Sequence, residues 1–287
     1  MKNAILMLCN NMTYLKAFID NYDQQDEDLI IINETRIGNK IDKIKDITKN
    51  IRCIVLDNKD IVEKFKEDNN CNNKFIDEYT MGGNILQNWY IFKYMDYDKV
   101  IVLDDDVLIN NIDKVFSYNK SLFYLFALSA GAKEYDLNSS IELLKVKAFG
   151  DIFDIEINRE NYKEVWTKNH INAGQRLYLK TEFDINKYEE YLVKFYTNSV
   201  MRFLWFKRKK PGSYYLDEWF ESMFAYKTGI INDILRTGKL AYIEIRNDDK
   251  ADFTKYDKHK THCIWHNATC SHKVQWLNKM KEHNLIK

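Results

Sequence analysis

The chain has 287 residues, and 45% of them are hydrophobic, which is enough to bury a sizeable core and excludes an intrinsically disordered protein. Lysine plus arginine and aspartate plus glutamate each number 43, so the formal net charge is zero. A balanced chain has no global field that would attract nucleic acid or an acidic partner, and any basic surface must be local.

The composition fits neither a membrane protein nor a disulfide-rich secreted domain. No stretch approaches the roughly 20 apolar residues of a membrane-spanning helix. The apolar start at Ala4–Cys9 is too short for the core of a signal peptide. Five cysteines at irregular spacings do not form a paired framework. We therefore expect a cytoplasmic protein with reduced thiols and no transmembrane segment. A single proline and abundant Asn, Lys, Ile and Asp are typical of an AT-rich genome, viral or low-GC bacterial.

Short apolar runs alternate with longer helical patterns, which is typical of βα units and a largely parallel sheet. The predicted elements, in chain order, are strand Ala4–Cys9, helix Met12–Tyr22, strand Leu29–Ile32, strand Ile51–Leu56, turn Asn69–Asn73, helix Ile85–Met95, strand Val100–Leu103 and strand Ser121–Leu128. A stretch rich in Asn and charged residues then continues to about Lys168 and predicts surface elements. We find no repeat and no linker, so we expect one domain over residues 1–287.

Three consecutive aspartates, Asp104–Asp106, stand between two apolar runs, Val100–Leu103 and Val107–Ile109. Carboxylates clustered where a buried strand ends repel one another unless they share a cation. The carboxyl edge of an open α/β sheet is also where ligands bind. Oxygen ligands favour Mg²⁺ or Mn²⁺, and Mg²⁺ is commonly held by one or two carboxylates plus substrate phosphates. The pattern predicts a divalent ion that binds a phosphate-bearing ligand. A solvated acidic turn and another metal-phosphate enzyme are the alternatives.

The segment Tyr97–Ile109 resembles the D-x-D segment of GT-A glycosyltransferases and is most similar to glycosyltransferase family 8. Two later segments continue the pattern: Ile171–Leu179 is similar to the Asn-x-Gly strand that faces the donor sugar, and Tyr215–Phe220 resembles the acidic start of a helix that lines the sugar pocket. His266, followed by Lys273, is similar to the family's late histidine and lysine region. Their separation is one residue longer than in the family, and the expected glycine and proline are absent.

The resemblance implies an α/β fold of GT-A, Rossmann-like type, with a mixed, mainly parallel sheet flanked by helices. Residues 1–111 would form the nucleotide-binding half and residues 112–287 the sugar and acceptor half. The implied activity is that of a hexosyltransferase-like enzyme, dependent on Mn²⁺ or Mg²⁺, which moves a sugar from a nucleotide diphosphate donor, a UDP-sugar. The acceptor is open among a glycan, a protein, a lipid-linked group and a nucleic acid.

Two other functions stay open. A sugar nucleotidyltransferase also uses Mg²⁺ held by carboxylates, but it usually carries a Gly-rich basic loop near its first strand, and Cys9–Met12 is not one. A catalytically silent module of the same fold would bind carbohydrate or nucleotide without transfer. Hydrolysis of a nucleotide sugar in the presence of Mn²⁺ separates an enzyme from such a module.

The implied site residues fall into three groups. They are the metal ligands Asp104, Asp106 and His266, the donor-binding residues Asp104, Asp105, Gly174 and Lys273, and the catalytic residues Asn172, Asp217 and Glu218. An inverting enzyme needs one carboxylate as general base, whereas a retaining enzyme needs none so placed, and both outcomes stay open. In the plainer interpretation, Asn172–Gly174 is a simple turn, and the two acids only stabilise a helix start through its dipole.

Two further segments carry polar chemistry. His262–His272 contains five potential zinc ligands, but their spacing matches no standard paired motif, so we expect His266 to bind the catalytic ion, and a structural zinc site in this cluster stays the alternative. The basic run Arg202–Lys210 predicts a solvated loop. The alternative for this run is contact with an anionic acceptor or with lipid head groups at a membrane surface, because aromatic residues alternate with its cations. Cys9 and Cys53 lie in strand patterns and predict inert, buried thiols.

Overall fold

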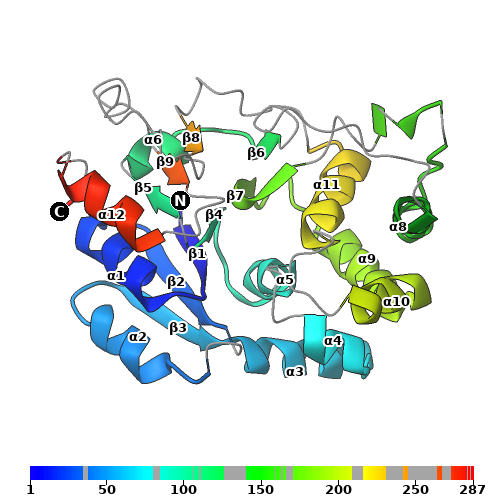
Figure 1. Cartoon of the computed structure of the whole chain (residues 1–287), viewed down its shortest axis with the longest axis horizontal. Coiled ribbons are helices and arrows are strands. Elements are labelled where there is room, and N and C mark those ends of the chain that lie inside the picture. Colours follow the sequence, from blue (N-terminus) through cyan, green and yellow to red (C-terminus); the bar gives the residue numbers. More distant parts are fainter. Residues whose placement is uncertain are drawn as a thin grey trace.

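The computed structural model describes residues 1–34, 38–79, 85–105, 107–109, 111–125, 140–158, 160–162, 164–165, 171–208, 216–230, 242–244, 264–266, 273–282, 284 and 286–287. Within these ranges a six-stranded sheet has the order β3-β2-β1-β4-β7-β6 (Figure 1). Its strands are β1 (Asn3–Cys9), β2 (Asp28–Asn33), β3 (Cys53–Asp57), β4 (Lys99–Asp104), β6 (Leu122–Leu125) and β7 (Ile171–Leu179).

The directions of these strands confirm the predicted mixed, mainly parallel sheet. β1 pairs in parallel with β2 and with β4, and β2 pairs in parallel with β3. β7 is antiparallel to both of its neighbours, β4 and β6. The apolar runs of β1, β2 and β4 are buried along nearly their whole length, because helices cover both faces of the sheet.

Two separate hydrophobic cores lie on the two faces. Alternate residues of β1 belong to different cores, with Leu6 in one and Ile5 and Met7 in the other. The helices of the larger core are α3 (Asn58–Asn69), α4 (Lys74–Tyr79), α5 (Ile85–Tyr94), α8 (Ser140–Phe153), α9 (Ile185–Thr197), α10 (Ser199–Arg208) and α11 (Leu216–Thr228). The helices of the smaller core are α1 (Met12–Asn21), α2 (Ile41–Ile47), α6 (Ile112–Phe116) and α12 (Lys273–Glu282).

A second, three-stranded sheet follows the aspartates. It consists of β5 (Val107–Ile109), β9 (Ile264–His266) and β8 (Tyr242–Glu244), with β9 in the middle. β5 and β9 are antiparallel, whereas β8 and β9 are parallel. The late histidine segment therefore pairs with the strand that begins just after Asp106.

Most predicted boundaries agree with the structure to within two residues. The predicted turn at Asn69–Asn73 lies between α3 and α4, and Asn70 ends α3 in the left-handed conformation with φ of 47°. Asn11 caps α1 by accepting hydrogen bonds from the amides of Thr13 and Tyr14. The predicted strand Ser121–Leu128 is observed as β6, and its last three residues lie outside the described part of the chain.

Two predictions were wrong. The stretch before Lys168 was expected to hold surface elements, but it contains α8, whose Phe149 and Phe153 are fully buried. The apolar residues of α8 recur at helical spacing, and the polar composition of the residues around it conceals this pattern. The basic run was expected to be a loop, but as far as Arg208 it belongs to helix α10, because Met201 and Leu204 pack in the larger core.

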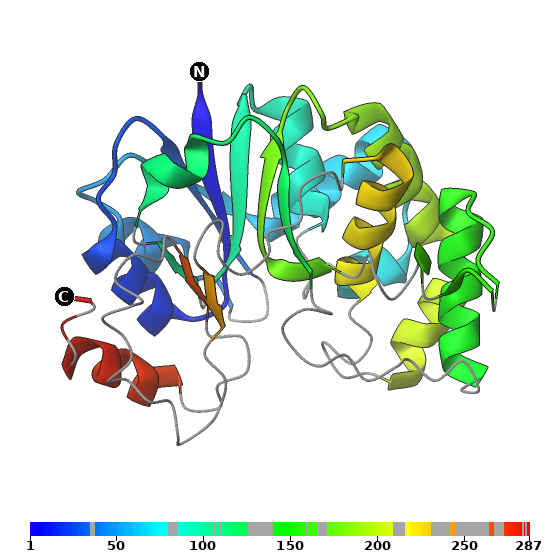
Figure 2. The same cartoon turned by 90° about the horizontal axis from the view of Figure 1, so that it is seen from above.

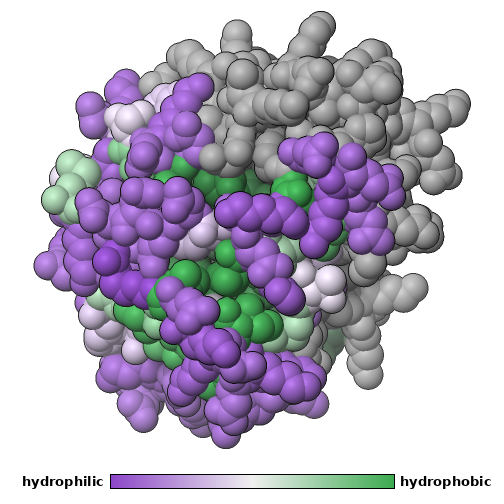
Figure 3. Space-filling model, turned by 90° about the vertical axis from the view of Figure 1, so that its left-hand side faces the viewer, coloured by the Kyte–Doolittle hydropathy of each residue, from purple (hydrophilic) through white to green (hydrophobic). Residues whose placement is uncertain are grey.

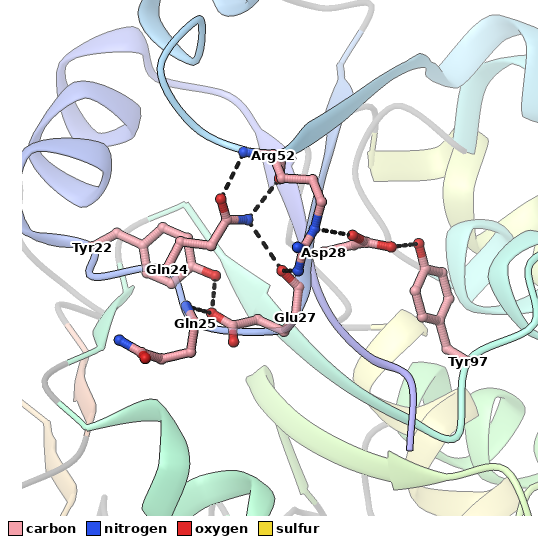
Figure 4. Close-up of polar contacts among 7 residues, drawn as sticks. All are labelled: Tyr22, Gln24, Gln25, Glu27, Asp28, Arg52 and Tyr97. Atoms are coloured by element: carbon pink, nitrogen blue, oxygen red, sulfur yellow. Dashed lines mark hydrogen bonds and ion pairs between the residues drawn. The ribbon is translucent and has the colours of Figure 1, made fainter.

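A polar network closes the edge at which the parallel strands begin (Figure 4). The Arg52 guanidinium lies 2.5 Å from Asp28 Oδ1 and donates to the Glu27 carbonyl at 2.6 Å. The Tyr97 hydroxyl, just before β4, donates to the other oxygen of Asp28 at 2.8 Å. Gln24 donates to the carbonyls of Arg52 and Glu27. The network joins the starts of β2, β3 and β4 and lies at the edge opposite to the aspartates.

The face that carries α1, α2 and α12 is shown in Figure 3, where hydrophilic side chains surround an apolar area. β3 is the edge strand on this side, and each of its residues, Cys53–Asp57, is only partly buried. In the described ranges, no helix combines the length and the hydropathy that a membrane crossing requires.

Candidate functional site

The carboxyl ends of β1 and β4 lie side by side and define the candidate site. The chain leaves β1 through α1 toward β2 on one side, while β4 lies on the other side, so the two strands flank a topological switch point. Open α/β sheets bind ligands outside the carboxyl ends of their strands at such a point. Leu8 pairs with Asp104 in the register, which puts the first aspartate at this edge. In Figure 2 the edge faces downward.

The side chain of Asp105, just after β4, is hydrogen-bonded to the segment that follows β1. It is buried, and Oδ2 accepts a hydrogen bond from the backbone amide of Asn10 at 2.9 Å. This contact fixes the segment between β1 and the cap of α1. Burial raises the pKa of the neighbouring Cys9 thiol to about 12, and the negative charges of Asp105 and Glu34 contribute to the shift. Burial likewise raises the pKa of Cys53 to about 11. Both thiols therefore stay protonated near neutral pH; Cys9 is buried as predicted, whereas Cys53 is only partly buried.

The predicted donor strand lies beside the end of β4. β7 pairs with β4 so that Arg176 is opposite Val102 and Gln175 is opposite Leu103. Continuing this register by one residue brings Gly174 opposite Asp104. A glycine here permits close approach of backbone and ligand. Asn172 belongs to the same strand, and its side chain lies outside the described part of the structure.

The second sheet brings the late histidine to the same edge. In the register of β5 with β9, Val107 is opposite His266, so the backbone of His266 lies across from the residue that follows Asp106. Asp106 and the side chain of His266 lie outside the described residues. Lys273 begins α12, and its side chain is also outside them, as is the His262–His272 cluster apart from β9. The side chains that are described contain no group of three or more His, Cys, Asp or Glu that could hold a metal.

The first turn of α11 carries the two predicted catalytic acids. Glu218 is buried, whereas Asp217 is partly exposed. Desolvation is the main reason that the pKa of Asp217 rises to about 7, and the charge of Glu218 adds to it while that of Arg176 opposes it. The Tyr79 hydroxyl lies 3.5 Å from Asp217 Oδ1 and donates to it. A carboxyl that titrates near neutral pH is suited to proton transfer.

α11 is held against the start of β7 by buried hydrogen bonds. The amide of Ile171 donates to Ser222 Oγ at 2.9 Å, and that hydroxyl donates to the Glu218 carbonyl at 2.5 Å. The strand that carries Asn172 and Gly174 is therefore fixed to the turn that carries the acids. Three of the residues that the sequence predicts to share a site, Asp104, Gly174 and Asp217, thus lie on β4, β7 and α11. β4 pairs with β7, and β7 is hydrogen-bonded to α11.

Sequence reasoning missed a buried ion pair between β7 and α11. Arg176 Nη1 lies 3.7 Å from Glu221 Oε1, and both side chains are completely shielded from solvent. The carboxylate of Glu221 accepts from the hydroxyls of Tyr178 and Tyr188, both at 2.5 Å, and from Asn88 Nδ2 at 2.7 Å. The sequence signal was a lone arginine inside an apolar strand and a lone glutamate on an apolar helix face.

No protein-family model and no curated protein sequence matches this chain. Solved structures similar to it include glycosyltransferases. The apo form of mouse xyloside xylosyltransferase 1 is 13% identical, with 93% of this chain and 98% of that chain covered and a TM-score of 0.49. The galactosyltransferase LgtC in complex with donor and acceptor sugar analogs is 12% identical, with 100% and 96% covered and a TM-score of 0.41. The apo-form glycosyltransferase GlyE of Streptococcus pneumoniae TIGR4 is 11% identical, with 100% of this chain and 65% of that chain covered and a TM-score of 0.45.

Proposed function

We propose that this protein is a metal-dependent glycosyltransferase. It takes a sugar from a nucleotide diphosphate donor, a UDP-sugar, and transfers it to a hydroxyl of an acceptor. The observation that carries the proposal is the convergence of separate polar segments at one edge of the sheet. The end of β4 at Asp104, the glycine-containing strand β7 and the histidine strand β9, which pairs with β5 just after it, are brought together by strand pairing, although they are far apart in the sequence.

The donor set at this edge suits Mn²⁺ or Mg²⁺. Asp104 and Asp106 offer carboxylate oxygens, and His266 offers an imidazole from β9, which pairs with β5. Divalent ions of the first transition-metal row bind such a combination of ligands. Asp104, Asp106 and His266 would hold the ion. When bound, a divalent cation neutralises the charge that develops on the leaving diphosphate as the bond to the sugar breaks.

The residues around the ion would orient the donor. Asp105 keeps the β1–α1 segment in place through the amide of Asn10, and this segment borders the nucleotide half of the site. Gly174 leaves room for the donor beside Asp104, and Asn172 would bind the sugar through its amide. Lys273, at the start of α12, would reach the phosphates as a point charge.

Asp217 is the residue that we assign to proton transfer. With a pKa of about 7 it accepts a proton from the acceptor hydroxyl at slightly alkaline pH and holds it on a carboxylate oxygen. Desolvation raises the pKa of Asp217, and the charge of Glu218 beside it adds to the rise. This role belongs to an inverting displacement, so the anomeric configuration of the product, measured by proton NMR, tests it directly. A product that retains the donor's configuration would remove Asp217 from this role.

The proposal is tested by following the release of nucleotide diphosphate from a panel of nucleotide sugars, with Mn²⁺ or with a chelator. We expect release from a UDP-sugar with Mn²⁺ and almost none with chelator. Asp106→Asn should abolish release without unfolding the protein, whereas Asp113→Asn, an exposed acid on the nearby helix α6, should leave it unchanged. Equal release by Asp106→Asn and the unmodified protein would contradict the proposed ion site.

A further inference from the structure

Arg176 lies buried between two acidic parts of the candidate site. It is opposite Val102 on β4, and since alternate residues of a strand point to the same face, Asp104 lies diagonally across from it on that face. Burial disfavours the charge on the Arg176 guanidinium, while Glu221 and, more weakly, Asp104 favour it, and Arg176 in turn opposes the rise in the pKa of Asp217. A positive charge that no solvent screens therefore acts on both the end of β4 and the start of α11.

Glu221 supplies the counter-charge to Arg176 but does not form a hydrogen bond with its guanidinium. The 3.7 Å separation from Arg176 Nη1 is too long for a hydrogen bond, and the oxygens of Glu221 are instead held by Tyr178, Tyr188 and Asn88. Its position is thus set by neutral donors on three elements. A buried ion pair of this kind is weak evidence for a stabilising role, because well-packed apolar residues often do as well or better.

We propose that Arg176 is a positioning residue of the ion site. Its positive charge lowers the affinity of the carboxylates at the end of β4 for a divalent cation alone, and it raises the affinity of the same site for the nucleotide diphosphate. Glu221 balances this charge from a position that Tyr178, Tyr188 and Asn88 fix. The proposal rests on the proposed ion at Asp104. The positive charge of Arg176 opposes binding of the cation and favours binding of the negatively charged nucleotide. We therefore expect the two ligands to bind together rather than separately.

Paired variants test the sign of this effect. Arg176→Met combined with Glu221→Gln removes both charges and keeps similar side-chain volumes. We expect Mn²⁺ alone, measured by electron paramagnetic resonance, to bind about tenfold more tightly to this double variant. We expect UDP in saturating Mn²⁺ to bind it about tenfold more weakly in calorimetry. A merely structural pair would weaken both affinities together or change neither.

Two single variants extend the test. Glu221→Gln keeps the arginine and removes its counter-charge, so Mn²⁺ alone should bind more weakly than to the unmodified protein. Arg176→Lys retains the positive charge and should keep both affinities within about threefold. As a matched control, Lys93→Met with Glu189→Gln removes a 2.5 Å ion pair between α5, the helix that precedes β4, and α9. This variant should change neither the affinity for Mn²⁺ nor the affinity for UDP.

The outcomes separate the two proposals. If the unmodified protein binds no UDP in a Mn²⁺-dependent way, the proposed function fails, and the role of Arg176 fails with it. If the unmodified protein binds both ligands but the double variant shifts neither affinity, or weakens both, only the role of Arg176 is overturned. If the double variant does not fold by circular dichroism, Glu221→Gln decides, and an unchanged or raised Mn²⁺ affinity in that variant overturns the proposal.

Discussion

Replacing Asp217 by asparagine should stabilise the protein more at high pH than at low pH. The pKa of Asp217 is raised from 3.8 to about 7 in the folded state. The native protein therefore binds more protons than the unfolded chain between these values, so this residue makes stability fall as pH rises from about 4 to about 7. Above pH 7 the penalty is complete, and below pH 4 it is absent. Asparagine has a similar shape and no charge to desolvate.

The magnitude follows from linkage. Because each pKa unit corresponds to about 1.4 kcal/mol, the penalty from Asp217 should grow by about 2–3 kcal/mol between pH 5 and pH 8. Urea unfolding of the unmodified protein and of Asp217→Asn at both pH values measures this growth, since contributions from other groups cancel in the difference. Asp113→Asn, at an exposed position, is the control and should show no such growth. A difference in stability that is the same at pH 5 and pH 8 would refute the account of this carboxyl.

Three further changes have defined outcomes. Arg52→Ala should lower the unfolding free energy by about 1–2 kcal/mol, because one partly exposed ion pair and one hydrogen bond to the Glu27 carbonyl are lost, and UDP binding should be unaffected. Asp105→Ala should cost about 1–3 kcal/mol in urea unfolding and also weaken UDP binding, because the amide of Asn10 loses its partner at the site; a loss of stability with unchanged binding would contradict its place in the site. Sedimentation with vesicles tests the alternative function of Arg202–Lys210, a peripheral membrane contact. This alternative predicts binding to anionic but not to neutral vesicles and a loss of binding in Arg202→Glu with Phe203→Ser, two exposed positions of α10, whereas equal sedimentation of both proteins would remove the contact.

The sheet and the position of the aspartates could be predicted because they depend on local patterns. The runs before Cys9 and Asp104 are apolar enough to be read as buried strands, and the change to acidic residues marks the end of β4. Helix α8 was missed because its flanking residues are polar. Its apolar positions become apparent only when they are set against a helical period.

The buried ion pair could not be predicted for a different reason. Arg176 and Glu221 are 45 residues apart, and nothing in either local sequence specifies the other as its partner. Their meeting depends on β7 running antiparallel to β4 and on α11 packing against it. The pairing of β5 with β9 is equally non-local, and only the resemblance of the late histidine segment to a known family predicted that this segment lies near the end of β4.

Calorimetry of UDP binding, with Mn²⁺ and with a chelator, tests the central claim most directly. The phosphates of UDP and the carboxylates of Asp104–Asp106 repel one another unless a cation lies between them. We therefore expect binding with Mn²⁺ to be at least about a hundredfold tighter than binding with chelator, a difference of about 2.7 kcal/mol. Equal affinity under the two conditions would contradict a metal-bridged donor at the end of β4.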